Sequence, residues 1–317
     1  NDEQEEENYQ SLLIIIEKQR IQESKEEFLL FLRLLLNIFN HHHRNRSFST
    51  KMFKILDFLS EKIKQYFTNF EIFDLLKSNQ MIILYLIDKQ IINIDEQISN
   101  EILQMSQETE WNYKFFFYPE IKPFISEEER LFIENFIKEH KIFDTFDQNR
   151  REGENDYIVS FYIRNDSVSE IDTYLNKTNL SLSSHIRDSI FESNSILKEK
   201  PPTLIEYAAF CGSIQIVKYL WLNKVELSSS LWIYGIHSNN PDIIHFLEEN
   251  HIDPPSGKYQ ECLLQSIECH HNEISEYISN ALLTSEKDNG IETQAKIEKI
   301  VSSFNFKEMP NEINDKF

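Results

Sequence analysis

Histidine and cysteine are the residues of this chain best suited to hold a metal ion, and they form two groups. Three consecutive histidines occupy positions 41–43, and Cys269 with His270 and His271 follows Cys262. Adjacent histidines on a helix point about 100° apart, so one ion would meet only one or two of them. Neither group contains the C-x-x-C pair typical of zinc sites. We therefore predict no metal site and interpret the groups as a solvated helix end and a structural segment.

Motifs for covalent or nucleotide chemistry are missing from the sequence. It contains no G-x-S-x-G nucleophile motif and no phosphate-binding loop, and its five glycines lie far apart. Carboxylates are so common, with 53 Asp and Glu, that pairs of them carry no information. We therefore predict a protein without a cofactor or catalytic activity. An enzyme with an unrecognised site in the N-terminal part is the alternative.

Charge and cysteine content limit the classes of partner. The formal net charge is −21, from 32 basic and 53 acidic residues. Nucleic acids and anionic membranes are bound by clustered Lys and Arg, so neither is an expected partner, and a basic protein partner is favoured. Three cysteines in 317 residues do not form a disulfide framework. With no basic signal segment at the start, this predicts a reducing, cytoplasmic location without membrane insertion.

Helices must position whatever residues act in this protein. Only 5 Gly and 8 Pro occur, which is too few for a fold rich in hairpin turns or glycine loops. Residues 28–39 are apolar nearly all round and predict a buried core helix. A polar stretch at 149–155 suggests a boundary. We predict an all-α protein with a helical domain at 1–150, a repeat region at 151–283, and a further repeat or linker at 284–317.

The segment 203–220, TLIEYAAFCGSIQIVKYL, carries the clearest motif. Thr203 precedes a short apolar helix that contains Ala208 and Ala209, and Gly212 follows it. Adjacent alanines let two helices approach closely, and glycine readily adopts the left-handed conformation that ends a helix. The pattern resembles the ankyrin repeat, T-P-L-H-x-A-A-x-x-G followed by a second apolar helix.

The motif recurs downstream at intervals of 27 and 31 residues, against about 33 in the family. Asn239 stands where the first copy has Gly212, and Asn tolerates the left-handed conformation. Pro241 falls in the first turn of the following helix, where proline is welcome. A weaker match lies at 168–175, and residues 183–197 separate it from the clear copies. We expect pairs of antiparallel helices that stack on one another, because one pair cannot bury its own apolar face.

Two departures from the family pattern affect the helix caps. Leu204 replaces proline and Glu206 replaces histidine, so we expect a weaker cap on the first helix and a loss of the usual Thr–His hydrogen bonding. Ser213 is expected to cap the second helix.

The resemblance implies a protein-binding role. The phrases SLWIYGIHSNNPDIIHFLEENHI and ECLLQSIECHHNEISEYI resemble ankyrin proteins of Trichomonas-type protists, in which an uncharacterised helical domain precedes more regular repeats. By that resemblance, further repeats are expected after residue 317. The family's recognition positions precede the turn residue of each repeat. Here they are Phe210, Cys211, His237, Ser238, Glu268 and Cys269.

Two functions therefore remain open. The first is a scaffold that binds proteins through the concave face of the repeats, with Phe210 as a natural anchor if it is exposed. Neighbouring elements could instead cover these positions. The second is a structural component that self-assembles, or docks on a larger assembly, through residues 1–150.

Overall fold

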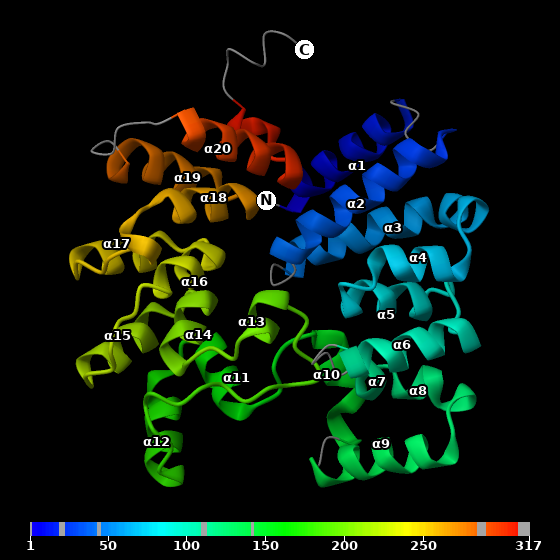
Figure 1. Cartoon of the computed structure of the whole chain (residues 1–317), viewed down its shortest axis with the longest axis horizontal. Helices are drawn as coiled ribbons and strands as arrows, with labels where there is room; N and C mark the ends of the chain where they lie inside the picture. The colour runs from blue at the N-terminus through cyan, green and yellow to red at the C-terminus, as the bar shows by residue number, and fades with distance from the viewer. Residues whose placement is uncertain are drawn as a thin grey trace. The chain divides into compact units, whose positions relative to one another are not determined.

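The computed structural model is all-helical, which confirms the all-α part of the predicted fold class, and its described residues contain no β-strand. The structure describes residues 2–18, 23–42, 46–108, 113–140, 143–283 and 290–309. None of the helices in these ranges is both long and apolar enough to cross a bilayer. The chain divides into two compact units. Figure 1 colours the chain by residue number, from blue at the N-terminus to red at the C-terminus. Unit 1 is Asn1–Asp156 with Asp188–Glu199, and unit 2 is Tyr157–Arg187 with Lys200–Phe317.

Unit 1 packs its helices around a core of aliphatic and aromatic side chains. Its elements are α1 (Asp2–Lys18), α2 (Lys25–His42), α3 (Arg46–Tyr66), α4 (Asn69–Leu76), α5 (Gln80–Asp88), α6 (Glu96–Glu108), α7 (Tyr113–Phe116), α8 (Tyr118–Ile121), η2 (Lys122–Phe124), α9 (Glu127–Glu139), η3 (Phe143–Thr145), α10 (Phe146–Glu152) and α13 (Ser195–Glu199). The predicted boundary after residue 150 falls within α10. Helix α2 buries one stripe, from Phe28 to Phe39, but Leu30 on another face is 54% exposed. The predicted core helix therefore contributes to the core, but with one face only.

The segment 188–199 belongs to unit 1 although the preceding residues belong to unit 2. Gln80 holds it by donating from Nε2 to the carbonyl oxygens of Ile190, Phe191 and Glu192, at 3.3, 3.1 and 3.2 Å. Lys198 Nζ donates to Gln80 Oε1 at 2.9 Å. One buried amide thus satisfies several polar groups of the segment, which fixes it on α5.

Unit 2 is a series of short helical hairpins. The pairs are α11 (Ile158–Arg164) with α12 (Val168–Thr178), α14 (Leu204–Cys211) with α15 (Ile214–Leu222), α16 (Leu231–Ser238) with α17 (Pro241–Glu249), and α18 (Gln260–Glu268) with α19 (Asn272–Tyr277). The unit also contains the turns η4 (Pro255–Gly257), η5 (Ile278–Leu282) and η6 (Phe306–Glu308), and helix α20 (Gly290–Ser303). Each first helix packs against the next, in the order α11, α14, α16, α18 and α20. Figure 1 shows the hairpins α14–α15, α16–α17 and α18–α19 following one another in that order.

A residue with positive φ ends the first helix of every hairpin. These residues are Asp166 (φ 50°), Gly212 (73°), Asn239 (51°) and His270 (57°), and Phe304 (59°) stands at the same place after α20. The N–H of each donates to the carbonyl three residues earlier. The left-handed residue reverses the chain within two positions, so the second helix can return antiparallel to the first.

Small residues let the two helices of a hairpin approach each other. Four residues before the turn residue stand Ala208, Gly235 and Ser266, all buried in the first helix. A Cβ atom on Gly235 would lie 2.8 Å from Ile243 Cγ2. The alanine motif seen in the sequence is therefore one case of a size limit that recurs along the unit.

The cap on α14 is stronger than we expected. Thr203 and Glu206 form a reciprocal capping box, in which Thr203 N donates to Glu206 Oε2 at 2.8 Å and Glu206 N donates to Thr203 Oγ1 at 3.4 Å. Glu206 also accepts from Ser230 Oγ of the next hairpin at 2.5 Å. The prediction of a weakened cap was wrong, because glutamate in this position satisfies the backbone itself.

The side chain of Ser213 does not cap α15 as predicted. Its hydroxyl instead donates to the carbonyl of Ile163 in the preceding hairpin, at 2.6 Å. The carboxylate of Asp166 accepts from the N–H groups of Gln215 and Ile216, at 3.1 and 2.9 Å, and performs the capping. Each hairpin thus supplies polar groups that its neighbour needs.

Candidate functional site

The predicted recognition positions lie at the ends of the first helices of unit 2, and two of them are buried. Phe210 is 3% exposed, and its ring stacks on His237 and meets Tyr234 edge-on. Cys269 is 0% exposed. Phe210 therefore does not offer the exposed anchor considered above. The other four positions, Cys211, His237, Ser238 and Glu268, are half-buried.

The thiols of Cys262 and Cys269 are protonated at neutral pH. Burial raises the pKa of both Cys262 and Cys269 to about 12. Cys269 Sγ lies 3.5 Å from His237 Nδ1, a contact between neighbouring first helices. A thiol with so high a pKa is a poor nucleophile, so this pair has the character of a packing contact. In the N-terminal histidine group, His41 and His42 end α2, and His43 lies outside the described residues.

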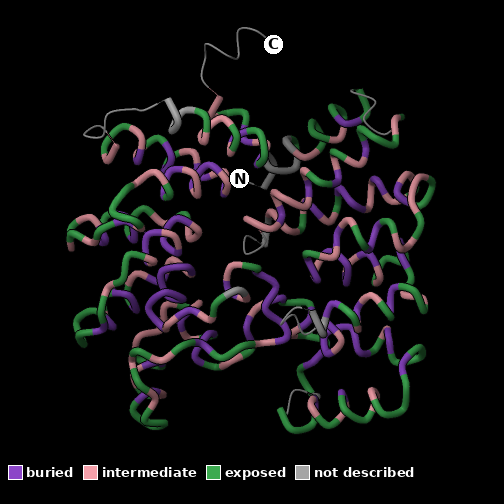
Figure 2. The backbone as a smooth tube through the Cα atoms, in the orientation of Figure 1, coloured by how far each residue is buried: buried purple, intermediate pink, exposed green. Residues whose placement is uncertain are grey.

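The second helices of unit 2 present a more exposed face than the first helices, as Figure 2 shows for α15 and α17 beside α14 and α16. Trp221 is 39% exposed and touches Phe246 of the next hairpin edge-on. Tyr219 donates to Asp172 at 2.6 Å, and Tyr277 donates to Glu248 at 2.5 Å. These contacts join the second helices of successive hairpins.

Unit 1 contains a buried ion pair that the sequence did not indicate. Arg150 Nη2 donates to both carboxylate oxygens of Glu120 at 2.8 Å, and its guanidinium lies over the rings of Phe116 and Phe146. Burial raises the pKa of Glu120 and outweighs the opposing effect of the arginine. The pair connects α8 to α10, and a buried ion pair beside two aromatic rings is a structural arrangement.

Lys198 is the most perturbed amine among the described residues. Burial lowers its pKa to about 8, although the carboxylate of Glu192 acts in the opposite direction. Its ammonium donates to Gln80 and lies 5.7 Å from the ring centroid of Tyr113. A lysine with this pKa is partly neutral near pH 8, but its hydrogen bond holds the segment 188–199 in place.

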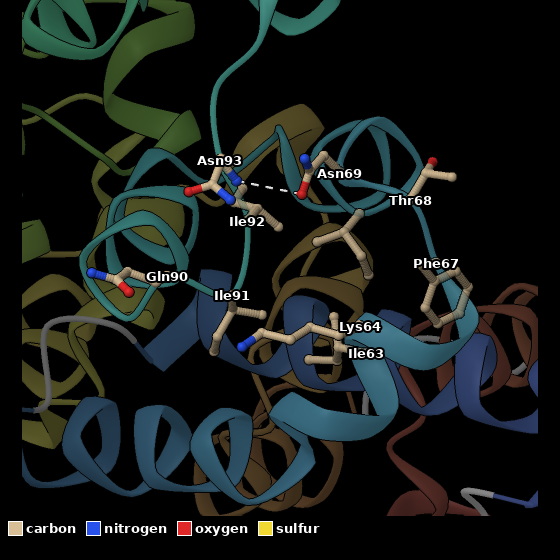
Figure 3. A pocket seen from close by; sticks show the side chains of 10 residues that line it. Ile63, Lys64, Phe67, Thr68, Asn69, Gln90, Ile91, Ile92 and Asn93 are labelled. Carbon is tan, nitrogen blue, oxygen red and sulfur yellow. Dashed lines mark hydrogen bonds between the residues drawn. The ribbon is translucent and has the colours of Figure 1, made fainter.

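A small pocket opens in unit 1 between α3, α4 and the link from α5 to α6 (Figure 3). Its volume is about 230 Å³. The apolar lining residues are Ile63, Phe67, Ile72, Ile91 and Ile92. The polar lining residues are Lys64, Thr68, Asn69, Gln90 and Asn93. Asn93 N donates to Asn69 Oδ1 at 3.4 Å, so the link from α5 to α6 is joined to the start of α4 at the opening. No motif in the sequence marks this pocket, because its residues come together only through tertiary packing.

No family model, curated protein or solved structure matches this chain.

Proposed function

We propose that this chain is a non-catalytic protein-interaction scaffold whose unit 2 is a stack of ankyrin-type helical hairpins. The observation that carries the proposal is the recurrence of one left-handed turn residue after α11, α14, α16, α18 and α20, with first helices packed in sequence. Such an array repeats the same surface position from hairpin to hairpin. Repeat proteins use extended surfaces of this kind to bind other proteins.

The half-buried ends of the first helices are the proposed contact region. Cys211, His237, Ser238 and Glu268 lie there, and the buried Phe210 supports His237 from beneath. The net charge of −21 favours a basic partner. Three free thiols suit a reducing compartment such as the cytoplasm.

A matched pair of histidine variants tests the contact region. His237→Ala removes a side chain from the proposed surface, whereas His245→Ala removes one from the exposed face of α17. In affinity capture from native extract, we expect His237→Ala to reduce recovery of a specific partner at least about fivefold, as interface residues do. His245→Ala should recover it at the wild-type level. Equal recovery by both variants, each with wild-type thermal unfolding, would contradict this surface. The full chain is used because residues 188–199 belong to unit 1.

An assembly role through unit 1 is the second candidate. The exposed aliphatic residues of α1 and α2 favour it, since Ile14, Ile15 and Leu30 are each about half exposed, at 49%, 52% and 54%. Exposed apolar groups of this kind are typical of contact surfaces. Mass measured by sedimentation at increasing concentration discriminates the two roles. A strict monomer would exclude self-assembly, and an oligomer that Leu30→Glu dissociates would support it.

A further inference from the structure

The two ends of the segment 188–199 are held together by hydrogen bonds within unit 2. Just outside the segment, Ile186 N donates to the carbonyl oxygen of Pro202 at 2.7 Å. An antiparallel bridge joins the neighbouring residues His185 and Thr203. All four of these residues belong to unit 2, whereas the segment itself belongs to unit 1. The segment is therefore a loop with a closed neck, and the neck does not depend on the contacts that the segment makes with unit 1.

The segment 188–199 contacts unit 1 in the way that a bound peptide contacts its receptor. Residues 188–194 contain no helix, and Gln80 donates to three successive carbonyl oxygens among them. Ser193 donates to the carbonyl oxygen of Gly153 both from its backbone N, at 3.0 Å, and from Oγ, at 2.7 Å. Hydrogen bonds to the main chain of an extended segment are a general source of affinity in peptide recognition.

A single aromatic side chain anchors the segment. Phe191 is 0% exposed, and its ring meets that of Phe146 edge-on, with 5.5 Å between the ring centroids. Phe146 begins α10, and Gly153 ends the same helix. A fully buried aromatic residue beside main-chain hydrogen bonds is the arrangement in which one side chain dominates binding.

Unit 1 has a hydrophobic core that is nearly complete without the segment 188–199. Residues 16–146 supply the described core of this unit, apart from Ile190 and Phe191. Regions that add few buried apolar side chains open locally, at a lower free energy than global unfolding. The distribution of core residues therefore separates the segment from the helices that it contacts.

We propose that the segment 188–199 is an intramolecular peptide ligand, which leaves the surface of α5 and α10 without unfolding unit 1. The vacated surface then binds an extended peptide of the same pattern from another protein. That pattern is an aliphatic residue followed by phenylalanine, with serine two residues later, as in Ile190, Phe191 and Ser193. This inference concerns unit 1 and does not rest on the scaffold proposed for unit 2.

Native-state hydrogen exchange of the full chain, read by mass spectrometry, tests whether the segment opens by itself. Amides of residues 190–194 should exchange at least about tenfold faster than those of α4, because release costs less than global unfolding. Phe191→Ala should accelerate exchange in the segment by a further factor of about ten or more and leave α4 unchanged. Phe132→Ala is the matched control, because Phe132 is 53% exposed on α9. Wild-type exchange at the same rate in the segment and in α4 would overturn the proposal.

A fluorescent peptide of residues 187–199 tests the vacated surface. In the wild-type chain the tethered segment competes at a high effective concentration, so the free peptide should bind weakly. The Phe191→Ala chain has a weakened segment but an intact surface, so it should bind the peptide at least about tenfold more tightly in fluorescence anisotropy.

Two further measurements locate the binding to this surface. Adding Gln80→Leu to the Phe191→Ala chain should remove the gain, because Gln80 binds the carbonyl groups of the segment. A peptide that itself carries Phe191→Ala should bind neither chain. Equal binding of the two peptides, or no gain in the Phe191→Ala chain, would overturn the proposal.

Discussion

The hairpin α4–α5 of unit 1 and the hairpin α14–α15 of unit 2 begin in the same way. Thr68 and Glu71 form a capping box at the start of α4, as Thr203 and Glu206 do at the start of α14. Both boxes join a threonine to a glutamate three residues later. The same local chemistry therefore starts a hairpin in each unit.

The two hairpins also end alike. Gln90 (φ 55°) and Lys224 (φ 66°) are left-handed at the second position after α5 and α15. The next N–H in each case donates back to a buried leucine, from Ile91 to Leu86 at 2.8 Å and from Val225 to Leu220 at 3.1 Å. His251 and Ile252 repeat this geometry after α17.

Only the turn between the helices differs. Gly212 and Ser213 alone separate α14 from α15, whereas residues 77–79 separate α4 from α5, with Lys77 in the right-handed helical region. The left-handed turn of α14–α15 favours glycine or asparagine and so leaves a signal in the sequence, whereas the turn of α4–α5 contains no left-handed residue and leaves none. The comparison teaches that the hairpin unit occurs in both halves of the chain. Its turn signal is visible in the sequence of unit 2 but not in that of unit 1.

The largest expected effect comes from the leucines at the hairpin ends. Leu86→Ala and Leu220→Ala each remove a fully buried side chain and should lower the free energy of unfolding by about 3 kcal/mol. Denaturant unfolding followed by circular dichroism measures both. Leu222→Ala is the control, because Leu222 is 70% exposed and should change little. A cost below about 1 kcal/mol at either buried leucine would break the comparison.

The two capping boxes should differ in strength. Glu206 is buried and also binds Ser230, so Glu206→Ala leaves buried donors unpaired and should cost about 2 kcal/mol. Glu71 is exposed, and Glu71→Ala should cost distinctly less. The same denaturant series gives the two values, and equal losses would mean that burial does not distinguish the boxes.

The pH dependence of a further Glu206 variant provides an independent check. Burial opposes ionisation of Glu206, but hydrogen bonds from Ser230 and Thr203 outweigh it and lower the pKa below the usual 4.5. A lowered folded pKa contributes stability that is present above pH 4.5 and is lost as pH falls through the folded value. The difference in unfolding free energy between wild type and Glu206→Gln should therefore shrink below pH 4.5. A difference that stays constant down to low pH would contradict the lowered pKa.

The turns themselves should respond differently to alanine. Gly212→Ala places a Cβ at φ 73° and should cost about 1–2 kcal/mol from backbone strain. Ser78→Ala, in the longer turn of unit 1, should change stability by less than about 0.5 kcal/mol. Thermal unfolding of both variants measures the contrast, and a neutral Gly212→Ala would remove the physical basis of the turn signal.

The smallest effect is expected at the left-handed residues that end the hairpins. Glycine relieves the strain of positive φ but increases the entropy of the unfolded chain. Gln90→Gly and Lys224→Gly should therefore each raise stability by no more than about 0.5 kcal/mol. A clear destabilisation of only one of them, in replicate denaturant titrations, would show that its side chain has a role that the other lacks.

Local chemistry explains what the sequence could predict. The left-handed turns at Gly212 and Asn239 were visible because both residues tolerate positive φ. The repeat interval of 31 residues also placed His270 at the turn of the last pair, and its φ is 57°. Asp166 has the same conformation in the first pair but was not recognised as its turn residue. The capping boxes at Thr68 and Thr203 did have a signal, threonine with glutamate three residues on, and could have been found.

Other features depend on the tertiary structure and could not be read from one sequence. Whether Phe210 is exposed depends on how the following hairpin packs, because Tyr234 and His237 cover its ring. The residues of the pocket come from α3, from α4 with the residues before it, and from the link between α5 and α6. Sequence patterns report one element at a time, so they give the helices but not which side chains of distant elements meet.

The return of residues 188–199 to unit 1 has a consequence for synthesis on the ribosome. Gln80 is made early, but the carbonyl groups that its amide binds follow about a hundred residues later, at separations of 110 to 112. Helices α11 and α12 are translated in that interval. The nascent chain therefore begins unit 2 before unit 1 can complete its fold. Residue 199 must have left the ribosome before either unit has its full set of contacts.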